Sequence, residues 1–245
     1  PVMVISLGGV AVNFGLNYAL IHGLFGLPHL GLMGIGLVTA VVANGMALLL
    51  ALHIRQHPAY APYPIRQGLM RPSLTYLQEL WRLGLPIGGT YAVEVGLFTF
   101  AAFCMGAMGS TQMAAHQIAL QSVSMAFMVP VGISYAMTMR IGQHYGAGNL
   151  LQARLAGRVG IAFGALIMLG FALLFWLAPY QVVSLFLDLD NPAYRDVIDL
   201  AVKLLAIAAW FELFDGTQTL AMGAIRGFKD ARTTFVIGLA CYWLV

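Results

Sequence analysis

The chain has 245 residues, of which 60% are hydrophobic and 9% charged, and its formal net charge is +3. Soluble domains carry roughly 25% charged residues, so this composition indicates a polytopic membrane protein. The basic residues lie in short segments between apolar runs and form no patch interleaved with aromatic residues, which argues against nucleic-acid binding.

Seven apolar stretches can be compared with the roughly 20 residues that a membrane-spanning helix needs. The predicted spans are Val2 to Ile21, Leu32 to Leu52, Leu83 to Met105, Ala114 to Met137, Val159 to Leu177, Ala201 to Gly223 and a last one from Thr233. They predict an all-α fold, a polytopic transmembrane helical bundle. Because apolar runs continue to both chain ends, we interpret the sequence as an internal part of a longer protein.

The distribution of basic residues predicts the orientation of these spans. Most of them follow the second, fourth and sixth spans: Arg55, Arg66, Arg71, Arg82, Arg140, Arg154, Arg158, Arg226, Lys229 and Arg232. The opposite side carries Arg195 and Lys203 among several aspartates. By the positive-inside rule, the arginine-rich loops are predicted to face the cytoplasm.

Two acidic residues lie at the same predicted membrane depth on different helices. Glu94 is about eleven residues into the third span, or roughly 16 Å from its cytoplasmic end, and Asp215 is about ten residues from the cytoplasmic end of the sixth. Carboxylates near the bilayer midplane are costly and usually functional, so we expect the two to form one site. Glu212 precedes Asp215 by three residues on the same helical face, and for it a structural and a functional role both stay open.

Other polar residues inside the spans have a simpler interpretation. Asn13 and Asn17 are four apart on the first span, and Gln117 and Gln121 are four apart on the fourth. Hydrogen bonding between helices is sufficient to explain most such residues. The two asparagines are also candidates for lining a second cavity.

No constellation in the sequence predicts an enzyme. Ser110 and Ser134 lack the histidine partner and flanking glycines of a nucleophilic serine. His53 and His57 have a helical metal-ligand spacing, but Pro58 follows and no acid or third histidine is near, which argues against a metal site.

The sequence resembles the multidrug and toxic compound extrusion (MATE) family, in particular its NorM-type branch. The matching stretches are LNYALIHGLFGLPHLGLMGIG, LPIGGTYAVEVGLF, GSTQMAAHQIALQ, PVGISYAMTMRIGQHYGAGN and FDGTQTLAMGAIRGFKD. The resemblance implies part of a twelve-helix, two-lobe transporter, with about six and a half helices present. Residues 1–54 would end the first lobe, 55–82 would form a cytoplasmic linker rich in proline, and 83–245 would belong to the second lobe.

The resemblance also implies a cation site in the second lobe. Glu94 and Asp215 occupy the positions of its two acids, and Phe211 stands where the family often has a tyrosine one turn before the second acid. We include Glu212 as a neighbouring candidate. The residues expected to line cavities are Asn13, Asn17, Gln117, Gln121, Tyr91 and Thr219. Sodium at Glu94 and Asp215 is the single metal considered, and no cofactor is expected.

These expectations describe a multidrug efflux transporter that exchanges organic cations for sodium or protons by alternating access. We expect it to act as a monomer in a plasma membrane, the inner membrane of a bacterium, with the lipid bilayer and small cationic drug-like molecules as partners. One alternative is a lipid-linked oligosaccharide flippase of the same superfamily, although its pyrophosphate would favour basic cavity residues. A seven-helix receptor is the other alternative.

Overall fold

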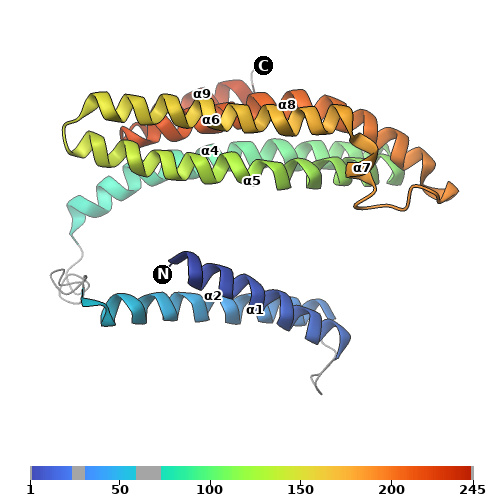
Figure 1. Ribbon diagram of the computed structural model, residues 1–245, viewed down its shortest axis with the longest axis horizontal. Coiled ribbons are helices and arrows are strands. Elements are labelled where there is room, and N and C mark those ends of the chain that lie inside the picture. The colour runs from blue at the N-terminus through green and yellow to red at the C-terminus, as the bar shows by residue number, and fades with distance from the viewer. Residues whose placement is uncertain (1, 24–30, 59–72, 244–245) are drawn as a thin grey trace. The chain divides into compact units, whose positions relative to one another are not determined.

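The computed structural model describes residues 2–23, 31–58 and 73–243, and within these ranges the regular elements are helical (Figure 1). They are α1 (Val2–His22), α2 (Gly31–Gln56), α4 (Leu74–Met108), α5 (Ser110–Gly146), α6 (Leu150–Leu177), α7 (Pro179–Val183), the 3-10 turn η3 (Pro192–Tyr194), α8 (Arg195–Gly227) and α9 (Ala231–Trp243). The chain forms two compact units, Pro1–Ser73 and Leu74–Val245.

Helices α1 and α2 form the first unit and pack against each other. At one contact the side chain of Met46 lies so close to Gly9 that a β-carbon at Gly9 would overlap its sulfur. Both helices are long and apolar enough to cross a bilayer. They correspond to the first two predicted spans.

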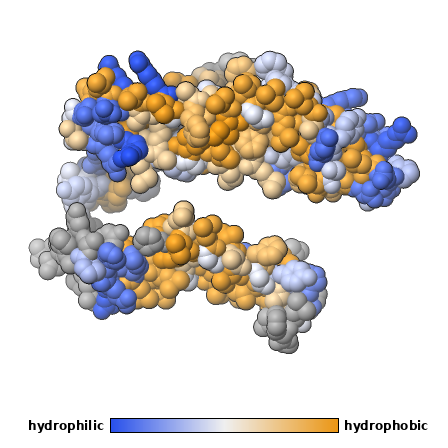
Figure 2. All heavy atoms as spheres, in the orientation of Figure 1, coloured by the Kyte–Doolittle hydropathy of each residue, from blue (hydrophilic) through white to orange (hydrophobic). Residues whose placement is uncertain are grey.

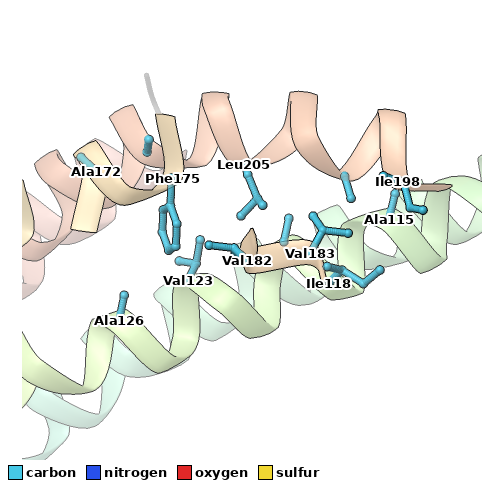
Figure 3. Packing of buried hydrophobic residues seen from close by; sticks show 13 residues of the cluster. Ala115, Ile118, Val123, Ala126, Ala172, Phe175, Val182, Val183, Ile198 and Leu205 are labelled. Carbon is cyan, nitrogen blue, oxygen red and sulfur yellow. The ribbon is translucent and has the colours of Figure 1, made fainter. Parts of the chain in front are cut away.

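In the second unit, α5, α6 and α8 pack against one another, and α9 packs along α4. Figure 3 shows the larger buried cluster, to which α5, α6, α7 and α8 all contribute. Ala115 of α5, Val183 of α7 and Leu205 of α8 are fully buried in it. Small residues let helices approach closely, and dispersion between them is a main source of stability where lipid replaces water.

The contact between α5 and α8 depends on glycine and on two hydroxyl groups. The Ser134 hydroxyl donates to the carbonyl of Thr219 at 3.0 Å, and the Thr138 hydroxyl donates to the carbonyl of Gly223 at 2.7 Å. A β-carbon at Gly223 would overlap the Ser134 side chain. The absence of a side chain at Gly223 therefore permits this close crossing.

Short turns make consecutive helices of the second unit antiparallel neighbours. Gly109, between α4 and α5, has a φ of 139°, and Gly148, between α5 and α6, has a φ of 74°, which are conformations that glycine adopts without strain. After Gly148, the side chain of Asn149 accepts a hydrogen bond from the Gln152 amide and caps α6.

Five of the described helices are long and apolar enough to span a membrane, namely α1, α2, α4, α5 and α6. The chain is therefore a multi-pass membrane protein with the predicted all-α fold. Figure 2 shows hydrophobic residues across the middle of the second unit and hydrophilic residues at its two ends. The sixth predicted span lies within α8, whose 33 residues include Glu212, Asp215 and Lys203 and are consequently less apolar.

The helices extend beyond the predicted spans because an apolar-length criterion measures the hydrocarbon core alone. For example, α4 begins at Leu74 rather than Leu83, α5 ends at Gly146 rather than Met137, and α6 begins at Leu150 rather than Val159. Since α2 also continues to Gln56, helix occupies both ends of the segment predicted as a linker, residues 55–82. Most of its proline-rich part, residues 59–72, lies outside the described residues.

Candidate functional site

Glu94 of α4 and Asp215 of α8 line one cavity of about 340 Å³ in the second unit. The other residues that line it come from α4 and α5: Val95, Phe98, Thr99, Ala102, Leu120, Val123, Ser124 and Phe127. Two acids therefore line this cavity, and its other lining residues are apolar or, like Thr99 and Ser124, carry a hydroxyl group. In this lining no basic side chain is present to neutralise them.

Asp215 is almost fully buried, with 4% of its surface exposed. Its Oδ1 atom accepts a hydrogen bond of 2.5 Å from the phenol of Tyr242 on α9. A buried carboxylate without a donor loses its hydration uncompensated, so this bond offsets part of that cost.

Glu94 is half-buried and lines the same cavity from α4. The negative charge of Asp215 and the positive charge of Arg226 both act on it, with opposite signs. A cation placed between Glu94 and Asp215 would relieve the repulsion between the two acids.

Glu212 lies outside the cavity lining and is fully buried in α8. In the described part of the chain neither of its carboxylate oxygens has a hydrogen-bond partner. Asp215 lies close enough to interact with it electrostatically. Glu212 is thus a neighbour of the cavity rather than part of its wall.

Phe211 packs edge to face against Phe98, with ring centroids 5.8 Å apart. Phe98 lines the cavity, so Phe211 supports an aromatic part of its wall from behind.

The remaining predicted residues are not part of the lining of this cavity. On α5, Gln117 and Gln121 are exposed, and the α5 residues that line the cavity are instead Leu120, Val123, Ser124 and Phe127. The carbonyl of Thr219 takes part in the α5–α8 contact. Tyr91 bonds to Tyr135 of α5 and Arg226 of α8 instead of lining the chamber.

Asn13 and Asn17 belong to the first unit, where they bond to each other. The Asn17 amide donates to the side-chain oxygen of Asn13 at 2.9 Å. The side-chain oxygen of Asn17 is buried and has no partner among the described residues.

Sequence reasoning did not single out Tyr242 or Trp243, both of which contact the site from α9. Tyr242 bonds to Asp215, and the Trp243 indole donates to the carbonyl of Val93, next to Glu94, at 3.3 Å. The sequence does place a tyrosine inside an apolar helix. A buried tyrosine hydroxyl usually has a hydrogen-bond partner, so this position could have indicated a contact with a polar residue.

Known proteins resemble this chain over its whole length. The MatE family model matches residues 86–245. A probable multidrug resistance protein NorM of Pseudomonas syringae pv. tomato is 74% identical over all 245 residues, which are 53% of its own length. A probable multidrug resistance protein NorM of Pseudomonas aeruginosa is 67% identical over 245 residues, and the multidrug resistance protein NorM of Burkholderia vietnamiensis is 41% identical over 241. The chain spans about half the length of these relatives.

Proposed function

The chain belongs to the MatE family, and from that premise we propose that it is part of a multidrug efflux transporter that exports organic cations in exchange for sodium or protons. The observation that carries the proposal is a cavity that is lined by both Glu94 and Asp215. Its two acids and aromatic wall favour a positively charged, partly apolar substrate.

In the proposed cycle, substrate and coupling cation compete for the same two carboxylates. A cation that enters from outside binds between Glu94 and Asp215 and displaces the substrate outward. Substrate that arrives from the cytoplasm displaces the cation when the cavity faces inward. Alternating access of this kind couples one gradient to the other because both ligands need the same countercharges.

The chemistry of the cavity also separates this function from flipping of a lipid-linked oligosaccharide. A pyrophosphate group needs basic or amide donors, whereas this lining carries two acids. The proposal also places the protein in the inner membrane of a bacterium, in line with the organisms of the relatives. It further holds that the protein acts as a monomer.

The test is efflux of ethidium by the complete protein in proteoliposomes, driven by an imposed sodium or proton gradient. Glu94→Gln and Asp215→Asn keep shape and hydrogen bonding but remove charge, so each should reduce coupled efflux to the level of empty liposomes. Glu79→Gln is the matched control, because Glu79 is an exposed acid on α4 whose partner is Lys229. Wild-type efflux by both cavity variants would refute the proposal.

A further inference from the structure

We propose that Tyr242 and Trp243 on α9 are positioning residues that hold the two carboxylates of the cavity at a fixed separation. The inference rests on the proposed function of Glu94 and Asp215 as the cation site. Neither α9 residue lines the cavity, so both act on it from behind its walls.

The two residues are consecutive in the chain but bond to different helices. The Tyr242 phenol donates to Oδ1 of Asp215 on α8 at 2.5 Å. The Trp243 indole donates to the carbonyl of Val93 on α4 at 3.3 Å. Val93 immediately precedes Glu94, so this dipeptide connects the backbone beside one acid with the carboxylate of the other.

Helix α9 is itself held against α4, which limits how far the dipeptide can move. The ring of Phe235 lies against Gly89 so closely that a β-carbon there would stand 2.7 Å from the ring. One turn further along α9, a β-carbon at Gly238 would lie 3.4 Å from the Thr90 methyl group. These contacts fix α9 on α4 close to Glu94.

The phenol also fixes the orientation of the Asp215 side chain. Among the described residues, the Tyr242 hydroxyl is the side-chain group that donates a hydrogen bond to this carboxylate, and the acceptor is Oδ1. A carboxylate has a second oxygen and further lone pairs, which remain for a cation in the cavity. A side chain that is ordered before binding loses less conformational freedom when the cation arrives, so binding is tighter.

The experiment measures ethidium binding to the purified complete protein by fluorescence anisotropy. Tyr242→Phe keeps the ring and removes only the hydroxyl that orients Asp215. We therefore expect it to raise the dissociation constant of ethidium about tenfold. Tyr194→Phe is the control, since Tyr194 directly precedes α8 and lies about 30 Å along that helix from Asp215. Its dissociation constant should match that of the wild type.

A double-mutant cycle tests whether the Tyr242 hydroxyl acts through the carboxylate of Asp215. In an Asp215→Asn background the phenol no longer orients a carboxylate, so Tyr242→Phe should change the residual affinity less than twofold. An equal loss of affinity in both backgrounds would show that the Tyr242 hydroxyl acts independently of the Asp215 carboxylate, and the inference would be wrong.

A second variant keeps the inference testable if Tyr242→Phe does not fold. Trp243→Phe removes the donor to Val93 and keeps an aromatic ring, so it should weaken ethidium binding at least threefold, and unchanged binding would contradict the inference. If the wild type binds ethidium and both α9 variants bind it equally well, positioning fails while the proposed function stands. Wild-type protein that binds no ethidium would overturn both.

Discussion

Arg226 of α8 and Tyr91 of α4 are 135 residues apart in the sequence and meet through two interactions. Arg226 Nη1 donates to the Tyr91 hydroxyl at 3.3 Å, and the guanidinium carbon lies 5.2 Å from the centroid of the same ring. The Tyr91 hydroxyl is also 3.2 Å from that of Tyr135. Because Tyr91 is one helical turn before Glu94, the pair joins α4 to α8 beside the cavity.

The two parts of this contact can be measured separately. Tyr91→Phe removes the hydroxyl and should lower the free energy of unfolding by about 0.5–1.5 kcal/mol. Tyr91→Leu also removes the cation–π contact and should cost a further ~0.5–1 kcal/mol, since the site is partly exposed. Thermal unfolding of the complete protein in detergent measures both, with Tyr76→Phe at an exposed position of α4 as control. Equal values for the Phe and Leu variants would exclude the ring contact.

Glu212 should limit stability more than transport. Its two carboxylate oxygens are buried without partners among the described residues, so Glu212→Met should raise the free energy of unfolding by about 1–3 kcal/mol. Because Glu212 does not line the cavity, Glu212→Gln should keep most of the coupled ethidium efflux that Asp215→Asn abolishes. Parallel unfolding and efflux measurements test this, and a complete loss of efflux in Glu212→Gln would instead assign Glu212 to the site.

Because α5 and α8 approach closely at Gly223, the stability of the protein should depend strongly on the size of the side chain at this position. Gly223→Ala adds a methyl group that overlaps the Ser134 side chain and should cost about 1–3 kcal/mol of stability. Gly170→Ala is the matched control, because a β-carbon there meets no atom within 4 Å, and it should stabilise α6 by up to about 1 kcal/mol. If Gly223→Ala unfolded at the wild-type temperature or above, the helices would not be in contact at Gly223.

Asp230, directly before α9, predicts a pH dependence. Hydrogen bonds from the Thr233 hydroxyl and amide hold the pKa of Asp230 below its usual value of 3.8. A lowered folded-state pKa gives stability that is present above the unfolded-state pKa and is lost as the pH falls through the folded-state value. Asp230→Ala should therefore unfold at a lower temperature than the wild type near neutral pH, and the difference should shrink in acid below about pH 4. A difference that stayed constant with pH would exclude the carboxylate as its cause.

The orientation proposed from charge can be tested with single cysteines in a variant lacking Cys104 and Cys241, both of which are exposed. Cysteine at position 190 should react with an impermeant maleimide from outside intact cells. Cysteine at position 154, in the arginine-rich region, should react only after permeabilisation. The reverse pattern would invert the orientation.

Depth along a helix is readable from sequence, whereas the direction in which a side chain points is not. Counting residues at 1.5 Å each placed Glu94 and Asp215 at one level, and the structure lines one cavity with both. A four-residue spacing likewise predicted a polar face at Gln117 and Gln121. The cavity uses the adjacent face of α5 instead, because the rotation of a helix about its axis depends on its neighbours.

The contacts of α9 could not be predicted for a related reason. Tyr242 and Trp243 reach Asp215 and Val93 across 27 and 150 residues of sequence. Neither bond has a local motif, since each depends on how α9 packs on α4 and α8. The span predicted from apolar length also began too late in α4, because the helix starts at Leu74, outside the apolar run.

The contact between Gly223 and Ser134 should restrict which residues homologous sequences can carry at these two positions. Any side chain at position 223 needs the space that the Ser134 side chain occupies. A change at position 223 is thus tolerated when position 134 becomes smaller or α5 moves away. Homologous sequences should accordingly show covariation between the two positions, with alanine or serine at 223 paired with glycine or alanine at 134.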